Sequence, residues 1–378
     1  MKNFHCSHCG MMIFFENDRC LKCDHPLGFV PETLELIALE QAKDNQWRAL
    51  GSAVSGQTYR RCANHQPHNV CNWLVPAGDP APFCQACRLN ELVPNLSEPK
   101  NVARWFKLEL AKRRCLYTFL KLGLPLSAGP AQGLPSLCFR FLQEMENAPV
   151  KTGHLNGVIT VNIAEADDDE RERRRIKLHE PYRTLVGHLR HESGHFYWTW
   201  LIDNSPNLPR FRELFGNETT DYDAALQTYY KQGPPTDWAA RAVTPYGCSH
   251  PWEDWAETWA HYLHIVDTLE SAAAFGLGVL DNASEQARQL NIKHSKSMDF
   301  PAMLAQWTPL VCALNAINRG MGLADLYPFV ISTPVVEKLR FIHQVVTDFR
   351  LPPNRAPKEP ASAKNQPDAR AVGSTAVG

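Results

Sequence analysis

The sequence His191-Glu192-Ser193-Gly194-His195 stands within residues 181–202, which we predict to form the central helix of the chain's largest domain. Pro181 suits the first position of a helix. Because a helix turns once every 3.6 residues, the two histidines lie one above the other on a single face. The helix also carries an apolar stripe at helical spacing, made of Leu185, Val186, Leu189, Phe196 and Trp200.

Two histidines four residues apart, with a glutamate after the first, form the HExxH pattern of zinc-dependent hydrolases. Zinc catalysis requires few protein ligands, an open position for water, and a carboxylate that takes the water's proton. A chain with 15 histidines can carry such a run by chance, so its context must support it. We predict one catalytic zinc ion held by His191 and His195, with Glu192 as general base, and we expect His188 to be a polar neighbour rather than a ligand.

Residues 250–261 are the source of a third ligand, because Glu253 and Glu257 are four apart and share a helix face that His261 extends by one turn. Two stacked carboxylates among tryptophans are costly to bury unless they are paired or bound to metal. We assign Glu253 as the metal ligand, and Glu257 and His261 as residues that support the ligands from behind. Asp254 or Glu257 as the ligand, and an exposed acidic face without metal, are the alternatives.

Two Cys-x-x-Cys pairs occupy the N-terminus: Cys6 with Cys9, and Cys20 with Cys23. A ten-residue spacer separates them, which is typical of a zinc ribbon in which four thiolates close a tetrahedron. Such a site is structural because no position is left for water. A module of this size is too small to fold on its own core, so we expect folding and zinc binding to be coupled.

A second, looser cysteine cluster consists of Cys62, Cys71, Cys84 and Cys87, and only the last two form a Cys-x-x-Cys pair. We predict a second structural zinc site there, with His65 and His68 as possible substitute ligands. The alternative is a group of reduced cysteines that makes apolar contacts. Four other cysteines stand alone in the sequence and are expected to be small buried hydrophobic residues: Cys115, Cys138, Cys248 and Cys312.

The composition is that of an ordinary globular protein, with 44% hydrophobic and 21% charged residues and a formal net charge of -1. A global basic field for nucleic acid is therefore absent. We see neither a secretory signal nor a run of roughly 18 apolar residues, and we expect a cytoplasmic protein that does not bind membranes. The basic run 171–175 contains and follows acids, so we interpret it as a solvated face.

Four parts follow one another along the chain. We predict a zinc ribbon at 1–30, a second cysteine-cluster zinc-binding module at 31–95, the large domain at 96–350, and a disordered tail at 351–378 that is rich in Pro, Ala, Lys and Ser. Helix outweighs strand, so we expect an α+β, mostly helical fold. We place one strand at 157–164 and further helices at 32–47, 101–122, 137–145, 253–269, 284–290, 303–319 and 334–346.

HExxH followed by a downstream Glu-x-x-x-Glu helix resembles the gluzincin class of zinc metallopeptidases. The resemblance implies that Glu253 is the third ligand. Some gluzincins place a transition-state tyrosine seven residues before this glutamate, which here is Tyr246, and its hydroxyl would donate to the developing oxyanion. The alternative for Tyr246 is a packing role in a Pro-Tyr-Gly turn. An aspartate ligand at Asp254 would depart from the gluzincin class but not from zinc binding.

Almost the whole chain except the tail resembles a bacterial family of zinc-binding metallopeptidases with N-terminal zinc ribbons. The matching stretches are Cys6-Ser7-His8-Cys9, Arg61-Cys62-Ala63-Asn64, Cys84-Gln85-Ala86-Cys87-Arg88-Leu89-Asn90, His191 to His195, and residues 252–264. The resemblance implies a zincin-like catalytic domain, preceded by small zinc-ribbon modules, that hydrolyses a peptide or protein substrate. The competing hypothesis is a protein- or nucleic-acid-binding module in which the ribbons make the contacts and the zincin-like domain is not catalytic.

Overall fold

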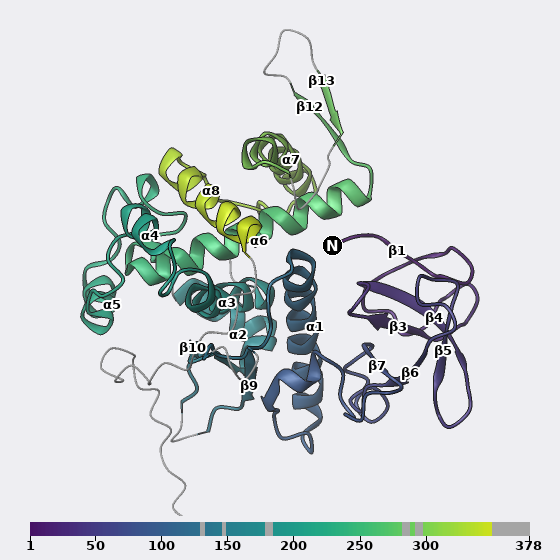
Figure 1. Ribbon diagram of the computed structural model, residues 1–378. Coiled ribbons are helices and arrows are strands. Elements are labelled where there is room, and N and C mark those ends of the chain that lie inside the picture. Colours follow the sequence, from purple (N-terminus) through teal and green to yellow (C-terminus); the bar gives the residue numbers. More distant parts are fainter. Residues whose placement is uncertain (129–132, 146–148, 178–183, 282–287, 292–297, 350–378) are drawn as a thin grey trace, which may run out of the picture.

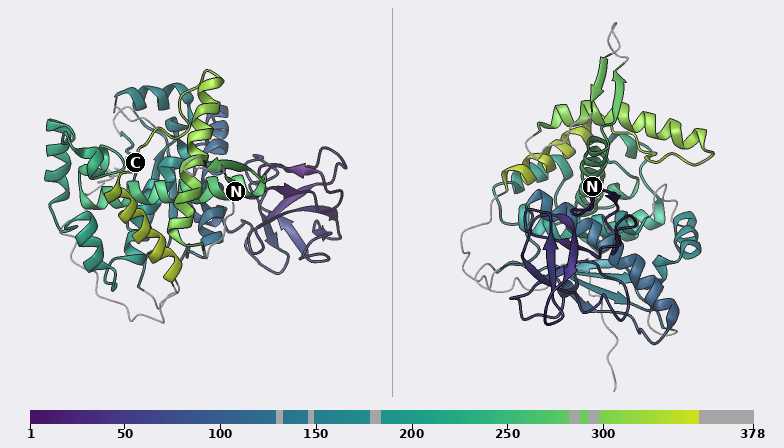
Figure 2. Two further views of the ribbon diagram at one scale, coloured as in Figure 1. Left: turned by 90° about the horizontal axis from the view of Figure 1, so that it is seen from above. Right: turned by 90° about the vertical axis from the view of Figure 1, so that its right-hand side faces the viewer.

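The computed structural model describes residues 1–128, 133–145, 149–177, 184–281, 288–291 and 298–349 (Figure 1). A small β region at the N-terminus and a larger, mostly helical region lie on opposite sides of helix α1 (Pro99–Leu122) (Figures 1 and 2). Some sequence predictions lie outside the described residues: the helix start at Pro181, residues 284–287 of a predicted helix, and the tail at 351–378.

The N-terminal region contains a short hairpin and a five-stranded antiparallel sheet with the order β3-β4-β5-β6-β7. The hairpin is β1 (Phe4–His5) with β2 (Met12–Ile13), and the sheet strands are β3 (Leu27–Val30), β4 (Glu35–Gln41), β5 (Trp47–Leu50), β6 (Thr58–Arg61) and β7 (Leu74–Pro76).

The prediction of a helix at 32–47 is wrong, because this stretch forms β4 and the start of β5. Four consecutive residues of β4, 36–39, are buried, and a short run buried on both faces has no period that separates strand from helix. The turn between β4 and β5 marks the hairpin more clearly than the strands do. Asp44 and Asn45 both adopt left-handed conformations, with φ of 56° and 58°, as tight hairpin turns require.

A second sheet lies in the helical region and has the order β10-β11-β9-β8. Strand β11 is parallel to β9, β8 is parallel to β9, and the edge strand β10 is antiparallel to β11. The strands are β8 (Asn90–Leu92), β9 (Cys138–Leu142), β10 (Gly153–Leu155) and β11 (Val158–Asn162).

The strand predicted at 157–164 is confirmed as β11, whereas the helix predicted at 137–145 is wrong and is β9. In β9 the buried residues Phe139 and Phe141 alternate with half-buried ones, which is the period of two that marks a strand with one face on the core.

The predicted helices at 101–122, 253–269, 303–319 and 334–346 are confirmed, and the helix predicted at 181–202 is confirmed from Leu185 onward, because Thr184 before it is an extended N-cap. They are α1 together with α3 (Leu185–Leu201), α6 (Pro251–Ala274), α7 (Phe300–Gly320) and α8 (Thr333–Asp348). The remaining helices are α2 (Asp168–Lys177), α4 (Leu208–Phe215), α5 (Tyr222–Gln232) and the 3-10 turns η1 (Cys87–Leu89), η2 (Ile163–Ala166), η3 (Trp238–Ala240) and η4 (Tyr246–Cys248).

One further prediction is wrong where the structure describes it. Residues 288–290, expected to be helical, belong to strand β13 (Arg288–Asn291), which pairs with β12 (Gly278–Asp281) in a projecting hairpin (Figure 1).

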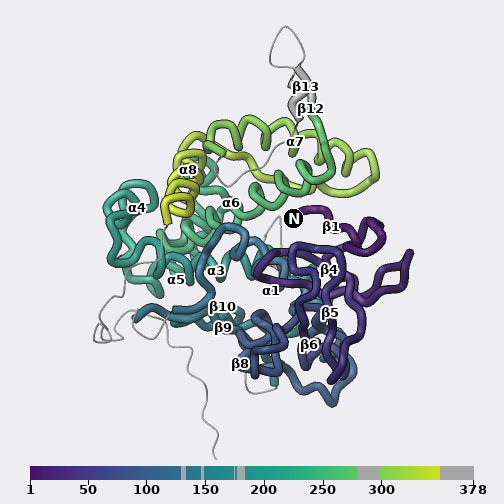
Figure 3. The backbone as a smooth tube through the Cα atoms, turned by 45° about the vertical axis from the view of Figure 1, so that its right-hand side comes forward, coloured from purple at the N-terminus to yellow at the C-terminus, as the bar shows by residue number. Residues whose placement is uncertain are grey.

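The N-terminal β region packs directly on the helical region through aromatic contacts on α1. The ring of Tyr117 on α1 lies 5.9 to 6.3 Å, centroid to centroid, from the rings of Phe4, Phe15 and Phe29. Asn3 also donates a 2.7 Å hydrogen bond to the carbonyl oxygen of Ala274 at the end of α6. The tube in Figure 3 shows the first residues running beside α6. Buried side chains of both regions belong to one hydrophobic cluster, and a second, smaller cluster lies within the N-terminal sheet.

Helix α7 is the one described helix that is long and apolar enough to cross a bilayer by length and composition alone. Its most apolar window has a mean hydropathy of 1.3, and 22% of that window is buried inside the structure. A single helix of this kind is weak evidence for a membrane span, because apolar helices of soluble proteins pass the same test.

Candidate metal centre

The HExxH run lies on α3 where that helix contacts α6 most closely. A Cβ atom added at Gly194 would stand 2.8 Å from the Cα of Ala256, so the absence of a side chain lets the two backbones meet. Two tryptophans of α6 then bond to the run itself: Trp255 Nε1 donates to the Gly194 carbonyl oxygen at 2.8 Å, and Trp259 Nε1 donates to Ser193 Oγ at 3.1 Å. The two residues between Glu192 and His195 therefore set the distance between the helices.

This packing brings three candidate ligands from two helices to one point. Potential ligand atoms of His191, His195 and Glu253 all lie within 4.8 Å of one another. Glu253 Oε2 is 3.1 Å from His191 Nε2, and Glu253 Oε1 is 3.5 Å from His195 Nε2. Glu253 is only 1% exposed, so its carboxylate faces the histidines and not solvent.

A chain of hydrogen bonds orients His191 from behind. Its Nδ1 lies 2.6 Å from Glu257 Oε1, and the hydroxyl of Thr244 donates to Glu257 Oε2 at 2.6 Å. A carboxylate that accepts the second ring N–H of a histidine fixes the tautomer that leaves the other nitrogen free to bind a metal. Glu257 therefore lies behind His191, bonded to the ring nitrogen that faces away from Glu253.

The residues of this group fit a divalent cation. Two imidazoles and one carboxylate are the ligand set of a catalytic zinc site with an open fourth position. Glu253 Oε2 is buried and accepts no hydrogen bond from the described residues, which is costly unless a cation lies beside it. Burial raises the pKa of Glu253, but the charges of His195 and His191 outweigh burial and hold that pKa well below its usual value.

The pKa of His191, one of the two candidate histidine ligands, shifts in the opposite direction from that of Glu253. Burial lowers the pKa of His191, yet the neighbouring carboxylates of Glu253 and Glu257 raise that pKa well above the ordinary value for histidine. Both pKa shifts have the same cause, because the carboxylates of this site stabilise positive charge on the groups beside them.

Glu192 and Tyr246 are neighbours of each other at this group, since the charge of Glu192 contributes to the raised pKa of Tyr246. Glu192 is 8% exposed, and within the described part of the chain its carboxylate makes no hydrogen bond. The ring of Tyr246, at the start of η4, lies 6.1 Å from that of His191. Burial and the charge of Glu253 raise the pKa of Tyr246 well above its ordinary value, so its hydroxyl keeps its proton.

Two further candidates lie away from the metal group. Asp254 follows Glu253 directly, but its side chain points to the other side of α6 and pairs with the buried Lys338 of α8. Burial raises the pKa of Asp254 to about 6 although Lys338 lowers it. His261 is buried one turn beyond Glu257, and its Nδ1 bonds to the hydroxyl of Tyr327.

His188, which we expected to be a polar neighbour, pairs through Nδ1 with Glu165 Oε2 at 2.6 Å, beside the sheet.

Besides Thr244, three residues at the site were not predicted from the sequence as site residues. The hydroxyl of Tyr222, the first residue of α5, donates to Glu253 Oε1 at 2.6 Å. The ring of Trp252 lies 4.1 Å from that of His195, and the ring of His154 on β10 lies 6.2 Å from it. Trp252 stands next to Glu253 and was open to prediction, but no spacing rule links Tyr222 or His154 to the HExxH run.

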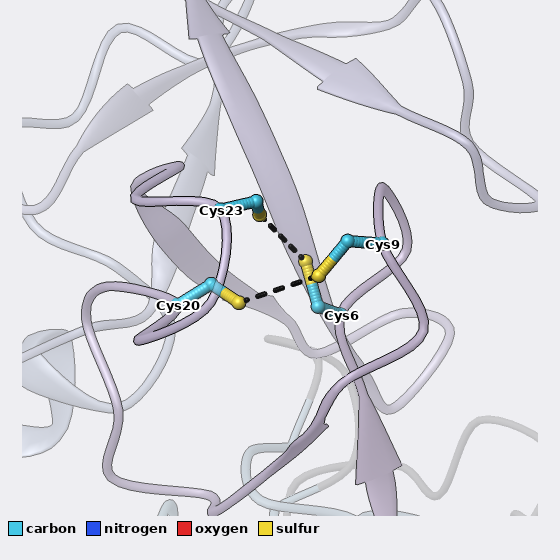
Figure 4. A group of neighbouring side chains, drawn as sticks. All are labelled: Cys6, Cys9, Cys20 and Cys23. Carbon is cyan, nitrogen blue, oxygen red and sulfur yellow. Dashed lines mark hydrogen bonds between the residues drawn. The ribbon is translucent and has the colours of Figure 1, made fainter.

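The first cysteine cluster has the geometry of a metal site (Figure 4). Cys6 Sγ lies 3.7 Å from Cys23 Sγ, and Cys9 Sγ lies 3.6 Å from Cys20 Sγ. Four sulfurs placed tetrahedrally around zinc at roughly 2.3 Å are separated by about 3.8 Å, whereas a disulfide joins its sulfurs at about 2.05 Å. The cluster therefore fits zinc and not cross-links.

The second cluster brings together all four predicted cysteines, which are buried: Cys62, Cys71, Cys84 and Cys87. The sulfurs of Cys71 and Cys84 are 3.5 Å apart. The predicted substitute ligands lie outside the group, because His65 Nδ1 bonds to the Cys71 carbonyl oxygen and His68 packs against Trp105.

A buried arginine of α1 neighbours the second cluster. Arg113 is 3% exposed, and its guanidinium donates to the carbonyl oxygen of Val70. Burial lowers the pKa of Arg113, but the charges of Cys71, Glu109 and the other thiolates raise it overall. This cation offsets part of the negative charge that four thiolates carry around a divalent ion.

The four isolated cysteines differ in their burial. Cys115 is buried as expected, Cys138 and Cys248 are half-buried, and Cys312 is exposed on α7, so the prediction of burial is wrong for Cys312. The basic run 171–175 lies on α2, where Arg171, Arg173 and Arg175 each pair with an acid three residues earlier, in agreement with a solvated face.

Comparison with known proteins agrees with this geometry. Residues 101–345 match the family model described as "Putative zinc-binding metallo-peptidase", and residues 3–98 match a zinc-ribbon domain model. Uncharacterised proteins of Mycobacterium bovis and Mycobacterium tuberculosis are 41% identical to the chain over 349 residues, which cover 92% of this chain and 96% of each relative. No solved structure matches it. With its HExxH helix, its third carboxylate and its two cysteine clusters, the chain belongs to this family of zinc-binding metallopeptidases that carry an N-terminal zinc ribbon.

Proposed function

We propose that the protein is a zinc-dependent metallopeptidase with a zincin-like catalytic domain, which hydrolyses peptide bonds in a peptide or protein substrate. The observation that carries the proposal is the position of Glu192, a free carboxylate one residue from a candidate metal ligand. A domain that only binds partners has no use for this carboxylate beside His191 and His195, whereas hydrolysis requires it.

In this proposal each residue of the site has a distinct chemical role. A zinc ion held by His191, His195 and Glu253 would supply Lewis-acid polarisation of the scissile carbonyl and lower the pKa of a water toward roughly 7. Glu192 takes the proton of the attacking water and afterwards transfers it to the leaving amine. Tyr246 keeps its hydroxyl proton and donates a hydrogen bond to the oxygen on which charge develops.

The two cysteine clusters have a separate role. Each uses four thiolates, so neither leaves a ligand position for water or substrate, and both are structural in this proposal. We therefore expect three zinc ions per chain, one at the HExxH site and one in each cluster.

Elemental analysis and peptide cleavage together test the proposal. Wild type, Glu192→Gln and the double variant His191→Ala/His195→Ala are purified in parallel, their zinc is counted, and each is incubated with a peptide library whose new termini are mapped by mass spectrometry. We expect wild type to cleave, Glu192→Gln to keep its zinc but lose cleavage by at least a hundredfold, and the double variant to lose one zinc ion.

Cleavage by Glu192→Gln at the wild-type rate would show that Glu192 is not the base or that a contaminant is responsible. An unchanged zinc count in the double variant would refute the site itself. A binding protein built on the zinc ribbons would then be the better account.

A further inference from the structure

We propose that Tyr222 is a positioning residue of the metal centre: its hydroxyl holds one oxygen of Glu253 and thereby directs the other oxygen toward the metal. The inference rests on the proposed function, in which Glu253 is the third ligand. It adds to the site a residue from α5, an element that lies outside both the HExxH helix and the helix of the third ligand.

The two oxygens of Glu253 have different surroundings. Oε1 accepts the hydrogen bond of Tyr222 at 2.6 Å, whereas Oε2 is buried, accepts no hydrogen bond from the described residues, and lies 3.1 Å from His191 Nε2. A hydrogen bond to one oxygen fixes the rotation of the carboxylate about its last side-chain bond. Because Tyr222 is a donor that brings no positive charge, it satisfies Oε1 without competing with a cation for Oε2.

The ring of Tyr222 is itself held in place. It packs against His250 and Trp252 at centroid distances of 5.2 and 6.0 Å, and both residues precede Glu253 at the start of α6. The Tyr222 hydroxyl therefore reaches the Glu253 carboxylate from a ring that is packed against the first residues of α6. Removing the hydroxyl alone leaves this aromatic packing unchanged.

Tyr246 provides the natural comparison, because it stands at the same site with a different set of contacts. Its ring neighbours those of His191 and of Tyr229 on α5, and its hydroxyl makes no hydrogen bond within the described residues. The two hydroxyls thus differ: that of Tyr222 is bonded to Glu253, whereas that of Tyr246 has no partner among the described residues.

The bond from Tyr222 also anchors α5. None of the residues of α5 is fully buried, and the contacts that hold the helix in place include Tyr222 on Glu253 and Tyr229 on Tyr246. We therefore expect metal binding and the position of α5 to be coupled through Tyr222.

Zinc affinity in the full-length holoprotein tests the proposal, with Tyr222→Phe as the variant and Tyr246→Phe as the matched control. Each protein is titrated with a zinc chelator, and the zinc that remains per chain is measured. Supporting residues of metal ligands change affinity by about 10- to 100-fold. We expect a loss in this range at the HExxH site for Tyr222→Phe, no change for Tyr246→Phe, and unchanged cysteine-bound zinc in both.

Cobalt substitution gives a second readout, since the absorption of Co²⁺ bound by histidine and carboxylate reports its coordination. We expect the spectrum to change in Tyr222→Phe and to match wild type in Tyr246→Phe. Equal zinc affinity in Tyr222→Phe and wild type, or equal losses in both variants, would overturn the proposal. Failure of the proposed metal site looks different, because wild type would then hold no zinc that depends on His191 and His195, and failure of the proposed catalysis appears in the cleavage assay with Glu192→Gln and not in zinc affinity.

Discussion

Substitution of Gly194 by alanine tests the idea that close contact between α3 and α6 assembles the metal centre. The added methyl group would stand 2.8 Å from the Cα of Ala256 and 3.2 Å from Cδ1 of Trp259. Carbon atoms in ordinary contact are about 3.5 to 4.0 Å apart, so the helices must separate by roughly 0.7 Å or more at this point. Neither neighbour is the flexible end of a side chain that could move aside.

The energetic result is a balance of two terms. Alanine is favoured over glycine within a helix by about 1 kcal/mol, whereas overpacking of a tight contact costs about 1 to 3 kcal/mol. We therefore expect a net loss of up to about 2 kcal/mol in the free energy of unfolding, which is a fall of up to roughly 8 °C in the melting temperature of a domain of this size.

The effect on the metal should be larger than the effect on stability. Glu253 is three residues before Ala256 on α6, so a shift of that helix moves the third ligand away from the histidines of α3. Metal–ligand distances tolerate deviations of about 0.2 Å, which is less than the expected displacement. We expect the zinc affinity of the HExxH site to fall at least tenfold, measured by chelator competition on the holoprotein.

Gly320→Ala is the matched control, because Gly320 also lies in a helix but an added Cβ would meet no atom within 4 Å. Its melting temperature should equal or exceed that of wild type, and its zinc should be unchanged. If Gly194→Ala melts as high as this control and keeps its HExxH zinc, the contact is not what assembles the site.

Three further predictions concern residues around the site and the core. Glu257→Gln should weaken zinc binding at the HExxH site by about 10- to 100-fold, measured by chelator competition, and an unchanged affinity would argue against its supporting role. Lys338→Met leaves Asp254 buried without its partner and should cost about 3 to 5 kcal/mol of unfolding free energy in denaturant titrations. The exposed Arg340→Met should change little, and equal costs would contradict the argument. Burial lowers the pKa of His343 below the ordinary histidine value of roughly 6.5. As the pH falls through that value, the unfolded chain therefore binds more protons than the folded one, and the free energy of unfolding decreases. The melting temperature of His343→Gln should therefore drop less than that of wild type between pH 7 and 5, and equal drops would refute this assignment.

Motifs whose parts are close in the chain were predictable. The Cys-x-x-Cys spacing of Cys6 with Cys9, and of Cys20 with Cys23, is enough to place the two sulfurs of each pair on one tight turn. His191 and His195 share a face through helical periodicity alone. In both cases local geometry relates the residues to one another before any tertiary contact forms.

Predictions were weakest where burial hides the period of a segment. In β4 a run buried on both faces looked helical, and in β9 the alternation of Phe139 and Phe141 was too short to overcome a helical interpretation. Strands of this length draw their stability from neighbours in the sheet, which the local sequence does not contain.

The sequence by itself determined the HExxH face and the ribbon cysteines, together with a short helix segment that had to supply a third ligand. Only the tertiary structure shows that Glu253 and not Asp254 lies beside the histidines, because adjacent residues on a helix point about 100° apart and the packing of α6 against α3 and α8 selects which one faces them. It also brought Tyr222 from 31 residues away in the chain, as well as His154 from the sheet edge. The reason is physical: spacing constrains side chains within one or two turns, whereas residues on separate elements meet only through the packing of those elements.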